Sequence, residues 1–265
     1  MRWIGNEAGV SREEEWSVVP RVIMTTERNP GYWRQIDKVP NSTWMDIGSR
    51  EFIQQYDELI WYPAEVDVSI RPSWGYMKGE AEKLHSLDTL INMYEKAVGG
   101  NANLLLNVPP NTEGLFDEAD VARLREMGNE IKRIFSKSQL ANASAAAGKG
   151  RDAGAVLNKD RGQFYEAASE ELPAIEIHLI GEKEINLVTI KETIELGQHI
   201  EEFCLEIPVA GGFQEIYRAA TVGYQRICRF PTVHTQVLRF RVLKARGKTS
   251  LTEIGIYYDD KHRNL

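Results

Sequence analysis

The chain has 265 residues, which is enough for one or two domains. Its hydrophobic content of 42% and charged content of 27% are ordinary for a globular protein. The formal net charge of −7 argues against a surface for nucleic acids or acidic membranes. No stretch approaches the ~20 apolar residues that a transmembrane helix needs. We therefore expect no nucleic-acid partner and no membrane span.

The first twenty residues combine glycines, a carboxylate and tryptophans. Gly5-Asn6-Glu7 lies between Trp3 and Trp16, and Pro20 ends the segment. Glycine lets a backbone approach another group closely, and a carboxylate beside aromatic rings is a frequent arrangement in sugar sites. The plainer interpretation is that Glu7 is one of 39 acidic residues and lies in solvent.

Residues 21–60 read as long loops with short elements, because Pro20, Pro30 and Pro40 interrupt any regular run. Long loops in a compact enzyme are often functional. Trp33 and Trp44 lie in this segment. They either line a subsite for a bound molecule or cover the hydrophobic core beneath a loop.

Residues 61–71 are rich in Val and Ile and predict a strand that ends near Arg71. Glu65 and Asp67 would then share one face of it. Charges on such a strand are costly unless they are paired or functional. Either Glu65 or Asp67 pairs with Arg71, or Glu65 contributes to a site. Trp74, in the loop that follows, can provide an aromatic wall for a ligand.

The next segment predicts a helix, a strand and a second helix. Ser86 is a suitable N-cap for apolar residues at helical spacing, and Gly99-Gly100 stops the helix. Asn103 to Val108 is typical of a parallel strand buried on both faces. Asp117 can cap the next helix, with Asp120 at its third position. The order strand, helix, strand, helix indicates an α/β fold.

Only two or three barrel-type strands precede residue 137, whereas a (β/α)₈ barrel needs eight. An open fragment would leave an unpaired parallel edge and part of its apolar interior in water. The pattern therefore indicates that further strands complete this part of the fold.

Residues 141–148 are small and polar, and suit a linker or the start of a second domain. Beyond them, apolar residues recur at every second position. They are Ile175, Ile177 and Leu179; Phe203, Leu205 and Ile207; Leu238, Phe240 and Val242; and Ile254, Ile256 and Tyr258. Short alternating strands with glycine-containing turns predict a β-sandwich. Whether it binds sugar stays open, and the lack of an evident cluster of exposed aromatic residues favours packing.

Cys204 and Cys228 are the only cysteines, which is too few for a disulfide framework. We expect free, buried thiols. The sequence has no Cys/His cluster with zinc spacing, so no metal and no cofactor are predicted.

Three ordered blocks resemble the α-L-fucosidases of glycoside hydrolase family 29, and most closely the branch that cleaves α-1,3/1,4-linked fucose from Lewis-type glycans. The blocks are residues 2–20, with Arg2-Trp3-x-Gly5-Asn6-Glu7-x-Gly9; residues 61–76, from Trp61 to Tyr76; and residues 104–114. The resemblance continues more loosely to about residue 258. It implies an α/β plus all-β chain. Residues 1–137 would form the C-terminal portion of a catalytic TIM-like (β/α)₈ barrel, and residues 138–265 a β-sandwich of the galactose-binding-like jelly-roll type, with a linker at its start.

The resemblance also implies a chemistry. A retaining glycosidase needs two carboxyl groups about 5–5.5 Å apart, one as nucleophile and one as acid/base. Glu7 matches the acid/base, whose pKa must be raised by burial or by a neighbouring anion. Glu65 is the alternative acid or a substrate contact. The expected substrate-binding residues are Arg2, Trp16, Trp61 and Trp74.

In the family, the nucleophile is an aspartate a few dozen residues before the block around Glu7, so its counterpart would precede Met1. We therefore expect the C-terminal half of a fucosidase, whose substrate is a fucosylated oligosaccharide or glycoconjugate. This half would be inactive without the missing N-terminal half of the barrel. The alternative is a non-catalytic carbohydrate-binding or structural remnant whose β-sandwich folds independently. No signal peptide is visible, but this N-terminus is not informative, so the location stays open; the family is compatible with a secreted or periplasmic one.

Overall fold

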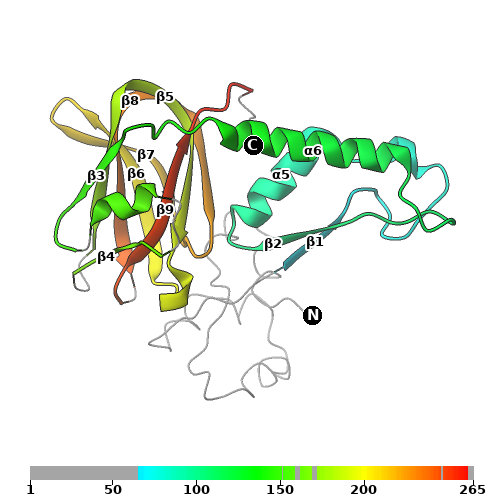
Figure 1. Ribbon diagram of the computed structural model, residues 1–265, viewed down its shortest axis with the longest axis horizontal. Helices are drawn as coiled ribbons and strands as arrows, with labels where there is room; N and C mark the ends of the chain where they lie inside the picture. The colour runs from blue at the N-terminus through cyan, green and yellow to red at the C-terminus, as the bar shows by residue number, and fades with distance from the viewer. Residues whose placement is uncertain (1–64, 151, 159–161, 169–171, 246, 262–265) are drawn as a thin grey trace, which may run out of the picture.

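The computed structural model describes residues 65–150, 152–158, 162–168, 172–245 and 247–261. Figure 1 shows two helices and a short parallel sheet on one side, and a larger β-sheet on the other. Neither of the two α-helices in the described ranges is long and apolar enough to span a membrane.

The helical side follows the predicted order. Strand β1 (Glu65–Ser69) pairs in parallel with β2 (Asn103–Asn107). The short helix η2 (Glu80–Lys83) and helix α5 (Leu87–Val98) connect the two strands, and α6 (Glu118–Ser136) follows β2. The predicted alternation of strand and helix is confirmed for this part of the chain.

Helix α5 begins and ends where the sequence indicates. The Thr89 amide donates to Ser86 Oγ at 3.1 Å, which confirms the predicted N-cap. At the other end, a Cβ on Gly99 would collide with the Glu95 carbonyl oxygen and with Ile227 of the larger sheet. Gly99 thus ends the helix and also lets the helix approach the sheet closely.

Strand β2 differs from the prediction in its burial. Val66 on the neighbouring strand is buried against Ala97 and Ala102, but Leu105 on β2 is 44% exposed. One face of the parallel pair is thus covered by α5, whereas the described residues leave Leu105 on the other face accessible. The sequence pattern predicts burial on both faces.

The larger sheet is antiparallel and has the order β4-β9-β5-β8-β6-β7, with β3 paired to β5. Its strands are β3 (Ser144–Ala147), β4 (Tyr165–Glu166), β5 (Ala174–Glu192), β6 (Ile200–Val209), β7 (Gly212–Ala219), β8 (Arg226–Ala245) and β9 (Ser250–Tyr257). The short helices η3 (Ala153–Leu157) and η4 (Ile194–Leu196) lie in its connections. Residues 144–147, which the composition places in a linker, therefore form a sheet strand. Their small side chains pack beside the core. Small residues give no strong strand pattern in a sequence, so the strand was not predicted.

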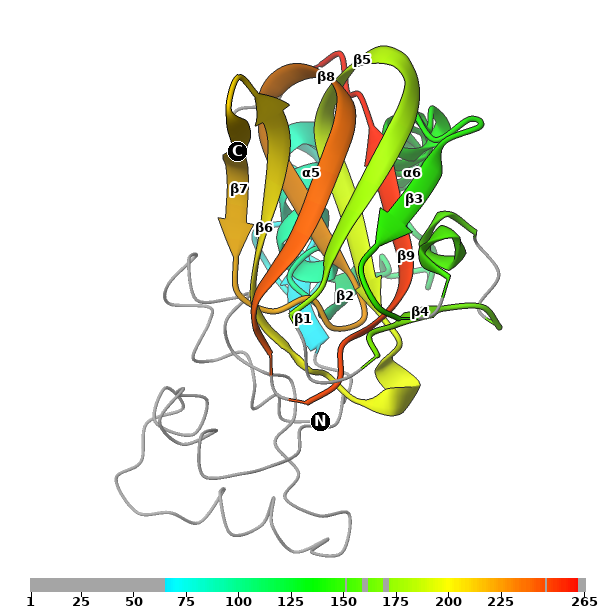
Figure 2. The ribbon, with the colours of Figure 1, turned by 90° about the vertical axis from the view of Figure 1, so that its left-hand side faces the viewer.

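Strands β5 and β8 give this sheet its shape. They are 19 and 20 residues long, and their pairing shifts register between His178 and Lys183 and again between Ile185 and Leu187. Figure 2 shows both strands arching over at one end of the sheet. Register shifts bend strands, and the two halves of β5 and β8 thereby contribute to one apolar cluster.

The predicted alternation gives the core of this sheet. The residues from the alternating pattern that are buried are Ile175, Ile177, Leu179, Phe203, Leu205, Leu238, Phe240, Val242, Ile254 and Ile256. Ile207 is half-buried, and Tyr258 lies just beyond β9. Cys204 and Cys228 are free and buried, as expected. Burial raises the pKa of the Cys228 thiol to about 12, so this thiol stays protonated at neutral pH.

A second apolar cluster joins the helices to the sheet. Leu90, Ile91, Met127 and Ile134 from α5 and α6 pack with Leu187, Ile227 and Tyr257 from the sheet. The rings of Phe135 and Tyr257 meet edge to face with centroids 5.4 Å apart. The helices and the sheet therefore share a core.

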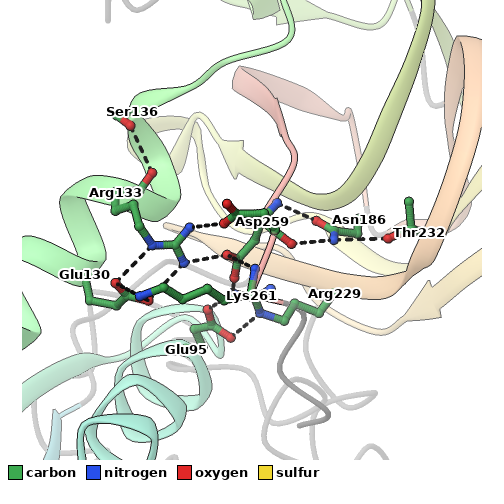
Figure 3. Close-up of polar contacts among 10 residues, drawn as sticks. Glu95, Glu130, Arg133, Ser136, Asn186, Arg229, Thr232, Asp259 and Lys261 are labelled. Atoms are coloured by element: carbon green, nitrogen blue, oxygen red, sulfur yellow. Dashed lines mark hydrogen bonds and ion pairs between the residues drawn. The ribbon is translucent and has the colours of Figure 1, made fainter.

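Ion pairs surround this shared core (Figure 3). The Arg229 guanidinium on β8 donates to both carboxylate oxygens of Glu95 on α5, at 2.6 and 2.5 Å. It also donates to Asp259, just after β9, at 2.9 Å. Arg133 on α6 donates to the other oxygen of Asp259 at 2.5 Å. Asp259 thus links both helices to the sheet, directly through Arg133 and through Arg229 to Glu95.

Polar contacts also join the turn after α5 to the segments that connect the strands of the larger sheet. Asn101, in the turn after α5, accepts from the Tyr224 amide at 2.7 Å and donates to Gln198 at 3.1 Å. Nearby, Glu192 accepts from three backbone amides, including that of Gly223 at 2.6 Å. Burial raises the pKa of Glu192 to about 7, although these amides favour its ionised form.

The Asp259 network has a pH dependence with a definite sign. Burial alone would raise the pKa of Asp259, but the hydrogen bonds and charges of Arg133 and Arg229 lower it below its ordinary value. A carboxylate with a lowered pKa stabilises the fold at pH values above its unfolded-state pKa. That contribution is lost as the pH falls through the folded-state pKa.

We expect Asp259→Asn to lower the free energy of unfolding by about 3–5 kcal/mol at pH 7, because two arginines lose a buried partner. The difference from the wild type should shrink below about pH 4, where this carboxyl group takes up a proton in the unfolded chain, and should continue to shrink until the pH passes the lower folded-state pKa. Urea denaturation at pH 7 and pH 3 measures both values. Asp260→Asn is the control, because Asp260 also contacts Arg133, at 2.7 Å, but is 67% exposed. An equal loss for Asp259→Asn at both pH values would contradict the linkage.

Candidate functional site

The described part of the predicted site lies at the carboxyl ends of β1 and β2. Ser69 and Asn107 end these strands and are partners in the parallel register. Loops at this end of parallel barrel strands carry the functional groups of (β/α)₈ enzymes. Trp74 lies in the loop that follows β1, and its side chain is 55% exposed.

The backbone of the Trp74 loop, residues 70–76, is tied to the strand ends. Asn107 Nδ2 donates to the Trp74 carbonyl oxygen at 2.6 Å and to Ser69 Oγ at 3.3 Å. Ser69 Oγ in turn donates to the Ser73 carbonyl oxygen at 2.9 Å. The Ile70 amide donates to the Asn107 carbonyl oxygen at 2.9 Å. These bonds fix the backbone while leaving the indole of Trp74 largely accessible.

A buried arginine ties the same loop to helix α6. Arg71 Nε and one terminal nitrogen donate to the two oxygens of Asp120, at 3.0 and 2.7 Å. The same terminal nitrogen donates to Asp117 at 2.6 Å, and the guanidinium lies 5.5 Å from the Tyr76 ring centre. The side chains of Arg71 and Asp120 are fully buried. The hydrogen bond to Asp120 is the largest cause that raises the pKa of Arg71, and the bond from Arg71 lowers the pKa of Asp117.

This arrangement corrects one interpretation of the sequence and gives Arg71 two partners that the sequence did not indicate. Asp117 is the N-cap residue of α6, but its side chain makes no capping hydrogen bond and binds Arg71 instead. Carboxylates of Asp117 and Asp120 hold Arg71. Both features have one cause, since the fold places a buried guanidinium at the N-terminus of α6, where carboxylates are also favoured by the helix dipole.

The loop after β2 lies beside the same helix start. Asn111 Oδ1 accepts from the amides of Glu113 and Leu115 at 3.0 and 3.1 Å. Asn111 Nδ2 donates to Asp117 at 3.3 Å. Leu115 and Phe116 in this loop are 61% and 51% exposed. Apolar side chains are thus accessible in both loops that follow the parallel strands.

The structure describes only part of the predicted site. Glu7, Arg2, Trp16 and Trp61 lie outside the described residues, as do Trp33 and Trp44. Glu65 begins β1 opposite Asn103, and its backbone alone is described. Among the described ranges no group of three or more His, Cys, Asp or Glu residues has the arrangement of a metal site.

Sequence reasoning missed the residues that hold the Trp74 loop. Asn107 and Ser69 are polar residues that end otherwise apolar strands, and this position was the available signal. Arg71 and Asp120 are separated by 49 residues, so no local pattern connects them.

Comparisons with known proteins identify relatives of this architecture. The family model for α-L-fucosidase matches residues 13–133. An α-L-fucosidase 1 candidate of rice (Oryza sativa subsp. japonica) is 32% identical over 268 residues, covering 97% of this chain and 48% of the rice protein. α-L-Fucosidase 1 of Arabidopsis thaliana is 30% identical over 273 residues, covering 98% and 50%. The chain spans about half the length of these relatives.

A solved structure agrees with these sequence matches. A family 29 fucosidase of Ruminococcus gnavus in complex with fucose superposes with a TM-score of 0.76 at 26% identity, covering 98% of this chain and 51% of that one. The mostly β architecture with two helices is thus that of solved family 29 glycoside hydrolases. The chain belongs to the α-L-fucosidase family, glycoside hydrolase family 29.

We expect Arg71→Met to lower the free energy of unfolding by about 3–5 kcal/mol, because Asp120 is left as a buried carboxylate without its guanidinium. Arg125→Met is the matched control, since Arg125 is an exposed arginine on α6, the helix that carries Asp120. It should change stability by less than about 0.5 kcal/mol. Chemical denaturation of both variants measures the difference. Similar small losses for the two would show that the buried pair adds little.

Proposed function

We propose that this chain carries the acid/base half of a retaining α-L-fucosidase, which releases terminal α-1,3/1,4-linked L-fucose from Lewis-type glycans. The observation that supports it most directly is Trp74, an accessible indole on a backbone fixed at the carboxyl ends of two parallel strands. Fucose is a deoxy sugar whose methyl group favours an aromatic wall. The relative from Ruminococcus gnavus was solved with fucose bound.

The proposal includes an architecture. Residues 1–137 are the C-terminal portion of a (β/α)₈ barrel, and residues 138–265 form a β-sandwich. The parallel β1 and β2, each followed by a helix, support the barrel assignment. The accessible Leu105 supports further barrel elements over that face, because parallel sheets are normally covered on both sides. The arched β5 and β8, which enclose a common core, support the sandwich.

In the proposed mechanism, a carboxylate from the remainder of the barrel attacks the anomeric carbon of fucose. Glu7 gives its proton to the leaving oxygen, and a covalent fucosyl-enzyme forms. Glu7 then takes a proton from the water that hydrolyses this intermediate. Arg2 hydrogen-bonds the sugar and helps to keep the nucleophile ionised. Glu65 is the alternative acid or a substrate contact.

Aromatic side chains supply the walls of the proposed site. Trp74 would pack against the methyl-bearing face of fucose, and Trp16 and Trp61 would contact the substrate. The alternative function, a remnant whose sandwich folds by itself, is less well supported. The sheet shares an apolar cluster and buried ion pairs with α5 and α6, so separating it would expose Leu187, Ile227 and Tyr257.

The acid/base role predicts a dependence on the leaving group. Residues 1–265, joined to the N-terminal half of a family 29 barrel, should hydrolyse both an aryl fucoside and a Lewis-type oligosaccharide. Glu7→Gln should lower kcat/KM on the oligosaccharide about 10²–10⁴-fold, because the poor leaving group needs a proton. It should cost much less on an aryl fucoside with an activated leaving group.

Two variants serve as comparisons for this measurement. Glu13→Gln removes a nearby carboxylate from the same segment and should leave both rates near the wild type. Glu65→Gln tests the alternative acid. Equal losses on both substrates for Glu7→Gln would remove Glu7 from the acid/base role, and a leaving-group dependence in Glu65→Gln alone would transfer that role. Normal turnover by the 265-residue chain by itself would show that the added barrel segment is not needed.

The aromatic wall makes a separate prediction. In the same joined barrel, Trp74→Ala should raise KM for a fucoside about 3- to 10-fold, the range expected for losing one aromatic contact. Trp74→Phe should retain most of the affinity, because a ring still faces the sugar. Steady-state kinetics measure both variants. An unchanged KM for Trp74→Ala would show that the indole does not contact the substrate.

A further inference from the structure

Helix α6 is held by buried charges at both of its ends. Near its first turn, Asp120 binds Arg71 of the Trp74 loop at 3.0 and 2.7 Å. In its last two turns, Arg133 binds Asp259 of the sheet at 2.5 Å. Asp120 and Arg133 are 13 positions apart, which corresponds to about 20 Å of helix. The helix is continuous from Glu118 to Ser136, so it connects the two contacts as one rigid element.

The contact at the sheet fixes the position of Asp259 on several sides (Figure 3). Its side chain is fully buried, and Arg229 on β8 donates to the carboxylate oxygen that Arg133 leaves free. Its backbone amide donates to Asn186 Oδ1 at 2.8 Å, and its carbonyl oxygen accepts from Asn186 Nδ2 at 2.9 Å. Residues of β5 and β8 therefore hold Asp259 in place independently of its contact with α6.

Neighbouring charges strengthen the same contact on the helix. Arg133 also donates to Glu130 at 2.9 and 3.0 Å, and Glu130 accepts from Lys261 at 3.0 Å. Lys261 follows Asp259 closely in the chain, so two adjacent helix turns meet the segment after β9. A shift of α6 along the sheet would separate several of these pairs at once.

Buried charge pairs tolerate little displacement, because a separated charge in a low-dielectric interior is costly. A movement of α6 relative to the sheet must therefore break the pair between Arg133 and Asp259. The same movement must either carry Arg71 along or break the pair between Arg71 and Asp120. Arg71 lies three residues before Trp74 in the same loop. The position of the sheet is thus transmitted through the helix to the loop.

We propose that α6 couples the β-sheet to the Trp74 loop, and that Asp259 is a positioning residue for this loop. The sheet then serves the site as a brace for its aromatic wall. That the loop faces a fucoside rests on the proposed function, whereas the coupling itself does not.

Hydrogen exchange of the 265-residue chain, followed by mass spectrometry, tests the coupling without any substrate. The reporters are peptides that cover residues 70–85, where the amides of Ile70 and His85 are hydrogen-bonded, and residues 117–136 of α6. Asp259→Asn should speed exchange in both reporters about threefold or more. Strands β6 and β7, on the far side of the sheet, should exchange as in the wild type.

Glu206→Gln is the matched control. Glu206 is a buried carboxylate that holds two arginines, Arg239 and Arg241, at 2.6 Å each, but all three residues lie on β6 and β8. Its loss should speed exchange within the sheet and leave residues 70–85 unchanged. If Glu206→Gln speeds the loop as much as Asp259→Asn does, general destabilisation explains the effect and the coupling is overturned.

A double variant distinguishes coupling from two independent structural losses. Arg71→Met removes the guanidinium that binds both Asp117 and Asp120, so adding Asp259→Asn should not speed exchange of residues 70–85 further. If the two effects were independent, their accelerations of exchange would multiply, and that result would overturn the proposal. Faster exchange of α6 with unchanged exchange of residues 70–85 in Asp259→Asn would also overturn it. If Asp259→Asn does not fold, Arg133→Lys replaces it with the same expectations, because lysine keeps the charge but cannot bind Glu130, Asp259 and Asp260 together as Arg133 does.

Kinetics of the joined barrel separate this inference from the proposed function. Asp259→Asn should raise KM for a fucoside more than it lowers kcat, and it should have no further effect on KM in a Trp74→Ala background. Coupled exchange without fucoside hydrolysis would overturn the function and leave the coupling standing. Hydrolysis with uncoupled exchange would do the reverse.

Discussion

Asp259 is a buried carboxylate that accepts hydrogen bonds from arginines on two different elements, Arg229 of β8 and Arg133 of α6. Because separating charges in a low-dielectric interior is costly, a movement of the helix away from the sheet is opposed by the loss of the Arg133–Asp259 pair. Glu95 adds α5 to the same arrangement through Arg229. The relative positions of the two helices and the sheet depend on this group of charges and on the apolar cluster beneath it.

The junction changes what the larger sheet contributes to the protein. Its strand pattern alone suggests a separate module, attached by a linker of small residues. In the structure those residues pair with β5, and the sheet supplies Leu187, Ile227 and Tyr257 to a core that it shares with α5 and α6. A sheet with these contacts is part of the framework of the site. Away from the helices, Arg239 and Arg241 of β8 pair with the buried Glu206 of β6.

At the other end of α6, the same kind of interaction shapes the candidate site. Asp117 was expected to cap α6, but its side chain binds Arg71 instead, and Arg71 also binds Asp120. Asn107 holds the carbonyl group of Trp74 from the neighbouring strand. The loop is thus fixed by β2 and by α6, and an accessible indole on such a backbone suits the recognition of a sugar face, which needs a wall in a defined place.

The sequence by itself determined the local elements and the family. Ser86 and Gly99 delimit α5, alternating apolar residues give the core strands, and three ordered blocks indicate an α-L-fucosidase. These features depend on neighbours within a few residues, or on motifs that can be compared directly. Only the tertiary structure decided the partners of Arg71, Arg229 and Arg133. The pairs lie 49, 134 and 126 residues apart, so the folded chain alone brings their charges together. The exposure of Leu105 and the pairing of residues 144–147 were decided in the same way, because both depend on which surfaces meet and not on the residues themselves.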